Sequence, residues 1–192
     1  YQAMRVKFGQ SIKNAAGLGP MGFGLPYAIG SCIAMKGRRT ILINGDGGFQ
    51  LNIQELETVK RLNLPIKIFI WDNGGYDSIR NTQRNLFDGF LVGADSSSGF
   101  TLPDVIAIAK AYKFRTAEIS TNSELKRGIA KVLSGDDPVL CNIIVKRNHL
   151  TMPRVKAMKL PDGNMISKPL EDMWPYLPPE EIDENMKISS DD

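Results

Sequence analysis

Asp46 and Asn73 are the residues of this sequence whose types and spacing best suit a chemical role. Asp46 stands among glycines in Gly45–Gly48, and Asn73 follows 27 positions later, before Gly74 and Gly75. A carboxylate, an amide oxygen and a backbone carbonyl, such as that of Gly75, are hard oxygen ligands, and Mg²⁺ binds few of them because phosphate oxygens and water complete its octahedron. The glycines let the backbone come close to a bulky anion. These residues therefore predict a diphosphate group held through Mg²⁺.

Two apolar runs position these residues. The runs cover 40–44 and 66–71, and each ends before a glycine-rich break. Between them, 51–62 has apolar residues at helical spacing, which predicts a βαβ unit with a right-handed crossover. Parallel strands of such a unit end at the same edge of the sheet, where open α/β sheets bind ligands. We therefore expect Asp46 and Asn73 to be neighbours in space, with the free N–H groups of the helix N-terminus beside the phosphate.

The same residues resemble a known family. The sequence GDG at Gly45–Gly47, followed by Asn73, resembles the diphosphate-binding motif of thiamine diphosphate enzymes, although Asp72 stands where that motif has its first Asn. An upstream block, Gly17–Pro26, resembles the GxMGFGLP segment of the acetolactate synthase group. The resemblance runs from about Ala15 to Val145 and is to the C-terminal, cofactor-binding (PP) domain of those enzymes. It is specific for the cofactor and much less so for the substrate.

The resemblance implies thiamine diphosphate and Mg²⁺ as cofactors and assigns roles to individual residues. The metal ligands would be Asp46, Asn73 and Gly75. The cofactor-binding residues would be Gly19, Met21, Gly45, Asp46, Gly47, Gly48, Asn73, Gly75 and Tyr76. The amides of Gly47 and Gly48 would face the diphosphate. Met21 would be the apolar wedge that bends the cofactor, and the alternative is that Met21 is an ordinary core residue.

The stretch after Tyr76 would border the substrate. Its candidate substrate-region residues are Ser78, Arg80 and Thr82. Acetolactate synthases carry a Met and a Trp where Ser78 and Thr82 stand, so the substrate can differ from theirs. Arg80 and Arg84 could bind an anionic substrate, because a guanidinium pairs bidentately with a carboxylate or phosphate. The alternative is that both are solvated surface residues.

Composition is that of an ordinary globular protein. The chain has 192 residues, enough for one domain with a core and a tail, and 24 Lys and Arg against 21 Asp and Glu leave a net charge of +3. That net charge is too small to indicate nucleic-acid binding, and the basic residues are not interleaved with aromatic residues. The sequence shows no signal peptide and no 18-residue apolar run, so we expect a cytoplasmic protein that does not bind membranes. Cys32 and Cys141 stand alone in apolar runs and are expected to be buried free thiols.

Strand and helix patterns alternate along the chain. Helices are expected from Pro20 to about Met35, from Pro103–Asp104 onward and at 122–133, and further strands at 114–119 and 139–145. This order predicts an α/β fold with a doubly wound, mostly parallel sheet and helices on both faces.

The expected organisation has three parts. Residues 1–150 form the cofactor-binding α/β domain. Residues 151–182 are too rich in proline for a long helix and too apolar for a free tail, which predicts an extended arm lying on the domain or on a neighbouring chain. Within this arm, 158–167 is a hypothetical lid over the cofactor. The polar stretch 183–192 is expected to be disordered.

The expected function is that of a cofactor-binding domain in a 2-keto acid decarboxylase or carboligase. No catalytic residue is expected in this chain, because the Glu that activates the aminopyrimidine in the resembling enzymes belongs to a pyrimidine-binding domain, of the same or another chain. We therefore expect a homo-oligomer, inactive without that domain. A non-catalytic thiamine diphosphate-binding module is the alternative. The resemblance leaves open whether the full-length protein is related to flavoproteins and binds FAD.

Overall fold

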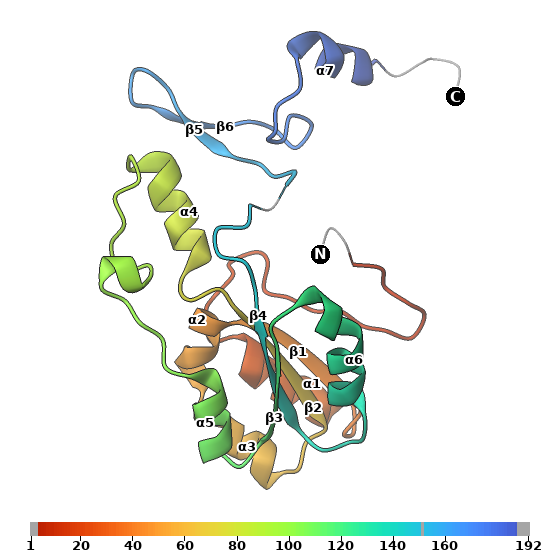
Figure 1. Ribbon diagram of the computed structural model, residues 1–192. Helices are drawn as coiled ribbons and strands as arrows, with labels where there is room; N and C mark the ends of the chain where they lie inside the picture. Colours follow the sequence, from red (N-terminus) through yellow and green to blue (C-terminus); the bar gives the residue numbers. More distant parts are fainter. Residues whose placement is uncertain (1–3, 151, 188–192) are drawn as a thin grey trace.

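The protein is built on a parallel sheet, as the sequence predicts. The computed structural model describes residues 4–150 and 152–187. Four parallel strands form the main sheet in the spatial order β1-β2-β4-β3 (Figure 1). Their bounds are Thr40–Gly45 for β1, Ile66–Asp72 for β2, Arg115–Ile119 for β3 and Val139–Ile144 for β4.

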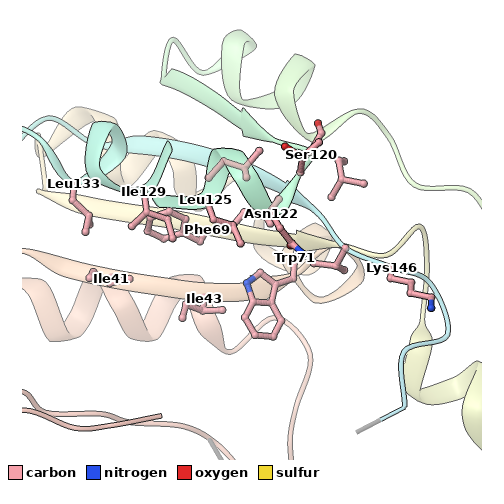
Figure 2. Close-up of a pocket in the computed structure, with 15 residues that line it drawn as sticks. Ile41, Ile43, Phe69, Trp71, Ser120, Asn122, Leu125, Ile129, Leu133 and Lys146 are labelled. Carbon is pink, nitrogen blue, oxygen red and sulfur yellow. The ribbon is translucent and has the colours of Figure 1, made fainter. Parts of the chain in front are cut away.

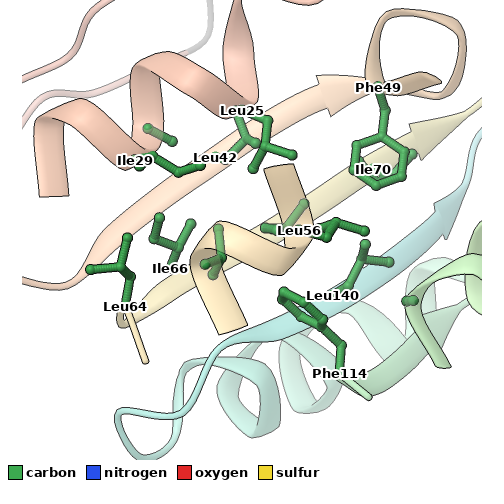
Figure 3. Close-up of a cluster of buried hydrophobic side chains, with 14 of the residues drawn as sticks. Leu25, Ile29, Leu42, Phe49, Leu56, Leu64, Ile66, Ile70, Phe114 and Leu140 are labelled. Atoms are coloured by element: carbon green, nitrogen blue, oxygen red, sulfur yellow. The ribbon is translucent and has the colours of Figure 1, made fainter. Parts of the chain in front are cut away.

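Helices cover both faces of this sheet, which confirms the predicted doubly wound α/β fold. One face carries α1 (Gly24–Ala34), α3 (Glu55–Arg61) and α5 (Val105–Ala111). Their apolar side chains enclose the larger hydrophobic core with the facing side chains of the strands (Figure 3). The other face carries α6 (Asn122–Leu133), which packs on β3 and β4 and is capped by a reciprocal hydrogen-bond pair between Thr121 and Glu124.

The second face is only partly covered. Beside α6, the outward side chains of β1 and β2 are about half exposed, at 51% for Ile41, 52% for Ile43 and 52% for Trp71. They line an apolar groove of about 510 Å³ together with Leu125 and Ile129 of α6 (Figure 2). The strands are therefore apolar on both faces, as parallel strands usually are, although one face is open here.

The strand register brings the carboxyl ends of β1 and β2 together. Gly45 lies opposite Trp71 in the parallel ladder. The short helix α2 (Asp46–Phe49) and the loop 73–75 therefore start from the same edge of the sheet. This confirms the expected adjacency of the two breaks, because parallel neighbours with aligned register must end side by side.

Two predicted helices differ from those in the structure. The first begins at Gly24 and not near Pro20, because Gly19 and Gly22 adopt left-handed φ angles of 64° and 85°, which a helix cannot contain. The crossover helix is divided into α2, a 3-10 turn η1 (Gln50–Asn52) and α3. A further helix that the sequence pattern does not predict, α4 (Asp77–Leu86), follows the loop after β2. A second 3-10 turn, η2 (Ser96–Ser98), lies in the expected loop before α5.

The C-terminal segment leaves the sheet beside α4 (Figure 1). It forms an antiparallel hairpin of β5 (Ala157–Lys159) and β6 (Met165–Ser167), and then α7 (Pro179–Asn185). The segment thus contains a hairpin and a helix in addition to extended chain. Its only helix in the described residues is seven residues long, which agrees with the expectation that its prolines exclude a long helix. The stretch expected to be disordered begins inside α7, and residues 188–192 lie outside the described part. Within the described ranges, no helix combines the length and the apolar character that a membrane span needs.

Both cysteines are buried free thiols, as the sequence predicts. Burial raises the pKa of the Cys141 thiol to about 11, with a further contribution from the negative charge of Glu118. We predict that neither thiol of the folded chain reacts with a thiol-specific chromogenic disulfide at pH 8, because the thiolate is the reacting species and both sulfurs are shielded. Absorbance at the end point should report two thiols per chain only after unfolding in guanidinium. Rapid labelling of the folded chain at pH 8 would contradict the burial.

Candidate functional site

The carboxylate of Asp46 is the centre of the site. Asp46 directly follows β1 and is only 2% exposed. Its Oδ2 accepts hydrogen bonds from three successive backbone N–H groups, those of Asn73 at 3.2 Å, Gly74 at 2.8 Å and Gly75 at 3.1 Å. Its Oδ1 accepts one from the N–H of Gly47 at 2.8 Å. The structure thus brings Asp46 and Asn73 together, as their positions after adjacent strands predict.

The surroundings of this carboxylate shift its pKa in opposing directions. Burial raises the pKa of Asp46, and the nearby charge of Asp72 adds to the effect, while the hydrogen bonds from the backbone amides act in the opposite direction. A divalent cation at the carboxylate would stabilise its ionised form.

Asp72, which replaces the first Asn of the motif, supports the loop. Its Oδ1 accepts a hydrogen bond from the N–H of Gly74 at 3.1 Å, and its Oδ2 accepts one from Asn142 Nδ2 at 3.1 Å. Sequence reasoning missed Asn142, although a polar residue inside the apolar run of β4 was a signal. Its Oδ1 is buried with no hydrogen-bond partner within the described ranges, and the residue borders a cavity of about 460 Å³ that Asp46 also lines.

Two glycines of the motif are required by close contacts. A Cβ on Gly47 would lie 2.3 Å from the ring of Tyr76, which stacks on Phe100 with ring centroids 4.4 Å apart. Gly75 has a φ of 143°, and a Cβ there would lie 2.4 Å from the carbonyl oxygen of Ala94. The backbone therefore forms a cradle too narrow for side chains at these two positions.

The donor set of this cradle fits Mg²⁺. Three residues that lie together at this edge of the sheet carry hard oxygen donors: the Asp46 carboxylate, the Asn73 amide oxygen and the Gly75 carbonyl. In this structure Asn73 Oδ1 accepts a hydrogen bond from Arg80 Nη2 at 3.0 Å. The amide of Gly47, which was expected to face a diphosphate, donates to Asp46 instead. Of the expected cofactor-binding glycines in the two breaks, Gly47 and Gly75 are buried, whereas Gly45 is exposed and Gly48 is partly exposed.

The upstream block lies next to this edge. A Cβ on Gly24 would lie 3.1 Å from the side chain of Asn44, which precedes the motif, and the carbonyl oxygen of Gly22 accepts from Asn52 Nδ2 at 2.7 Å. Met21 is 44% exposed, so the alternative that it is a core residue is wrong in this structure. Its expected role as a wedge, and the contact expected at Gly19, stay predictions.

The substrate-region candidates lie on α4 and differ in exposure. Ser78 and Thr82 are exposed. Arg84 is exposed and donates to Asn148, which agrees with a surface residue. Arg80 is fully buried, so the surface alternative is wrong for this residue, and its guanidinium contacts the loop 73–75 and two carboxylates rather than an open space.

Curated relatives match most of this chain. The acetolactate synthase large subunit of Cyanidium caldarium is 34% identical over 158 residues, which are 82% of this chain and 26% of that protein. Acetolactate synthase 2, chloroplastic, of Zea mays is 35% identical over 149 residues, 75% of this chain and 23% of that protein. The acetolactate synthase isozyme 2 large subunit of Escherichia coli (strain K12) is 31% identical over 169 residues, with shares of 86% and 26%. The chain thus spans about a quarter of the length of these relatives.

A solved structure and a family assignment agree with these relatives. The thiamine diphosphate-dependent 4-hydroxybenzoylformate decarboxylase of Rhodococcus jostii RHA1 has a TM-score of 0.61 and 28% identity, over 68% of this chain and 24% of that chain. The family described as "Thiamine pyrophosphate enzyme, C-terminal TPP binding domain" matches residues 1–143, which include the cradle around Asp46. The chain therefore belongs to the C-terminal TPP-binding domain family of thiamine pyrophosphate enzymes, which use Mg²⁺ alongside that cofactor.

Proposed function

We propose that this chain holds the diphosphate of thiamine diphosphate through Mg²⁺ in a larger enzyme that acts on 2-keto acids, as acetolactate synthases do. The observation that carries this proposal is the fold of the loop 73–75 over the buried carboxylate of Asp46. Asp46, Asn73 and the carbonyl of Gly75 would bind the cation. Gly19, Met21, Gly45, Gly47, Gly48 and Tyr76 would line the rest of the cofactor site.

The chemistry divides between the cofactor and the chain. When bound, thiamine diphosphate supplies the electron sink that 2-keto acid decarboxylation requires. The residues of this chain bind and orient: the carboxylate of Asp46 fixes the cation, and the glycine cradle lets the backbone approach the diphosphate. Ser78 and Thr82, at the exposed side of α4, are our candidates for the substrate side of the pocket.

The remaining parts of the enzyme would come from elsewhere. We propose a pyrimidine-binding domain, of the same or another chain, that supplies the activating Glu in a homo-oligomer. The hairpin β5–β6, which lies beside α4, stays a hypothetical lid. The cytoplasmic location expected from the sequence stays a prediction, and one of the relatives above is named chloroplastic. The suggested relation to flavoproteins has no support from the relatives.

Cofactor binding tests the central part of the proposal. We predict that calorimetry detects binding of thiamine diphosphate in the presence of Mg²⁺ and none of NAD⁺. Asp46→Ala should weaken thiamine diphosphate binding at least about tenfold, because it removes the charged ligand of the cation. Asp183→Ala, an exposed position on α7, is the matched control and should leave the affinity unchanged. Equal affinity of the Asp46→Ala variant would refute the metal site.

The cradle gives a second prediction. Gly75→Ala should lower the free energy of unfolding by roughly 1–3 kcal/mol, because an L side chain is strained at a φ of 143° and would collide with Ala94. It should also weaken cofactor binding, since the loop must move away from Asp46. Denaturant unfolding and calorimetry would measure both effects. Gly30→Ala is the control: its Cβ would meet nothing within 4 Å, and alanine in a helix should stabilise the chain by about 0.5–1 kcal/mol.

Activity gives a third prediction. The purified chain, supplied with thiamine diphosphate, Mg²⁺ and pyruvate, should release no CO₂ and form no acetolactate, because the activating Glu is expected on another domain. Sustained turnover by the chain alone would show that this expectation is wrong. Cofactor binding that persists when the pyrimidine-binding domain is supplied, still without turnover of any 2-keto acid, would favour the non-catalytic module.

A further inference from the structure

Arg80 has the largest side chain among the fully buried residues that the structure describes. It lies in the first turns of α4, shortly after the loop 73–75. Charged side chains are seldom fully buried unless several partners compensate for the lost hydration. The partners of this guanidinium therefore indicate what it does.

The guanidinium contacts the loop and two carboxylates. Its Nη2 donates to Asn73 Oδ1 at 3.0 Å and to the backbone oxygen of the same residue at 3.3 Å. Its Nη1 donates to the carbonyl oxygen of Gly74 at 3.4 Å. Ion pairs join it to Asp77 at 3.0 Å and to Asp95 at 3.5 Å. Three of these five contacts are thus with the loop that carries the proposed metal ligands, whereas Arg80 Nε is buried and has no hydrogen-bond partner among the described residues.

These contacts fix the orientation of two successive peptide groups. A trans peptide group directs its C=O and its N–H in opposite directions. Arg80 holds the carbonyl oxygens of Asn73 and Gly74, and the N–H groups of the same two peptide groups point to Asp46 Oδ2, at 2.8 and 3.1 Å. The guanidinium and the carboxylate therefore hold the loop from opposite sides.

The guanidinium is itself anchored to a fixed segment. Asp95 accepts hydrogen bonds from the hydroxyl and the N–H of Ser97, which hold its pKa below the ordinary value. Gly75 pairs with Asp95 in an isolated bridge, and the N–H of Tyr76 donates to the carbonyl oxygen of Ala94 at 2.8 Å. Arg80 thus connects the loop to a segment that is already paired with it.

We propose that Arg80 is a positioning residue, which presets Asn73 Oδ1 and the peptide groups of the loop 73–75 for the cation and the diphosphate. This inference rests on the proposed function. A planar guanidinium suits the role because it can donate to several oxygens in fixed directions, whereas the compact ammonium of lysine cannot reach them all. Arg80 then acts from behind the cofactor site and does not contact the substrate.

The first test measures cofactor affinity in three variants of the full chain. Calorimetry with thiamine diphosphate and Mg²⁺ should show at least a tenfold loss for Arg80→Met, a smaller loss for Arg80→Lys, and no more than a twofold change for Arg84→Met. Arg84 is the matched control because it lies one turn further along α4 and is exposed. An affinity of Arg80→Met within twofold of the unchanged chain would overturn the proposal.

The second test needs no cofactor. Amide hydrogen exchange of Gly74 and Gly75 should accelerate at least tenfold in Arg80→Met, while the amides of β2 and β4 keep their protection. Unchanged exchange at the two glycines, or an equal acceleration throughout the sheet, would overturn the positioning role. The Arg80→Met change leaves the carboxylates of Asp77 and Asp95 without their guanidinium partner, which could prevent folding. The double variant Arg80→Met with Asp95→Asn removes one of these two negative charges and is measured in parallel. It should show the same local acceleration of exchange if the single variant does not fold.

The two tests separate this inference from the proposed function. If the unchanged chain binds no thiamine diphosphate with Mg²⁺, the proposed function fails. The exchange experiment then shows whether the guanidinium still controls the loop. If the unchanged chain binds the cofactor and Arg80→Met binds it equally well, only the inference about Arg80 fails.

Discussion

A single carboxylate oxygen, Oδ2 of Asp46, holds the site together by accepting three successive backbone amides. A buried carboxylate without partners would be strongly destabilising, and the loop after β2 provides the compensating N–H groups. The chain follows this path only with glycine at 75, whose φ angle is 143° and whose Cβ would collide with the carbonyl oxygen of Ala94. The carboxylate of Asp46 and the glycine-containing loop therefore depend on each other. The guanidinium of Arg80 binds the carbonyl oxygens on the opposite side of the same loop.

The sheet makes this interaction possible. Aligned parallel strands deliver Asp46 and the loop 73–75 to the same edge, and the core between the sheet and the helices α1, α3 and α5 keeps those strands fixed. The loop itself is short, so small shifts in strand register would separate the carboxylate from the amides. Packing far from the site thus determines the geometry of its donors.

Much of this arrangement follows from the sequence by physical argument. Two apolar runs with a helical segment between them imply a parallel pair, and a parallel pair places Asp46 beside Asn73. The part that could not be predicted depends on tertiary contacts. Arg80 stands in a polar stretch that resembles solvated surface, and only the fold shows that its side chain is buried. Asn142 and the late start of α1 at Gly24 likewise depend on neighbours distant in sequence or on left-handed glycines. The hairpin β5–β6 could not be predicted, because a proline-rich composition excludes long helices but does not show which residues pair as strands.

The open groove beside α6 has a practical consequence for the handling of this chain. Its isoleucine and tryptophan side chains are about half exposed to solvent. Burial of such an apolar strip against any other surface is favourable because it releases ordered water. Concentrated solutions of the chain by itself are therefore expected to self-associate through β1 and β2. Dilution and mild detergent are the conditions that should keep its particles small.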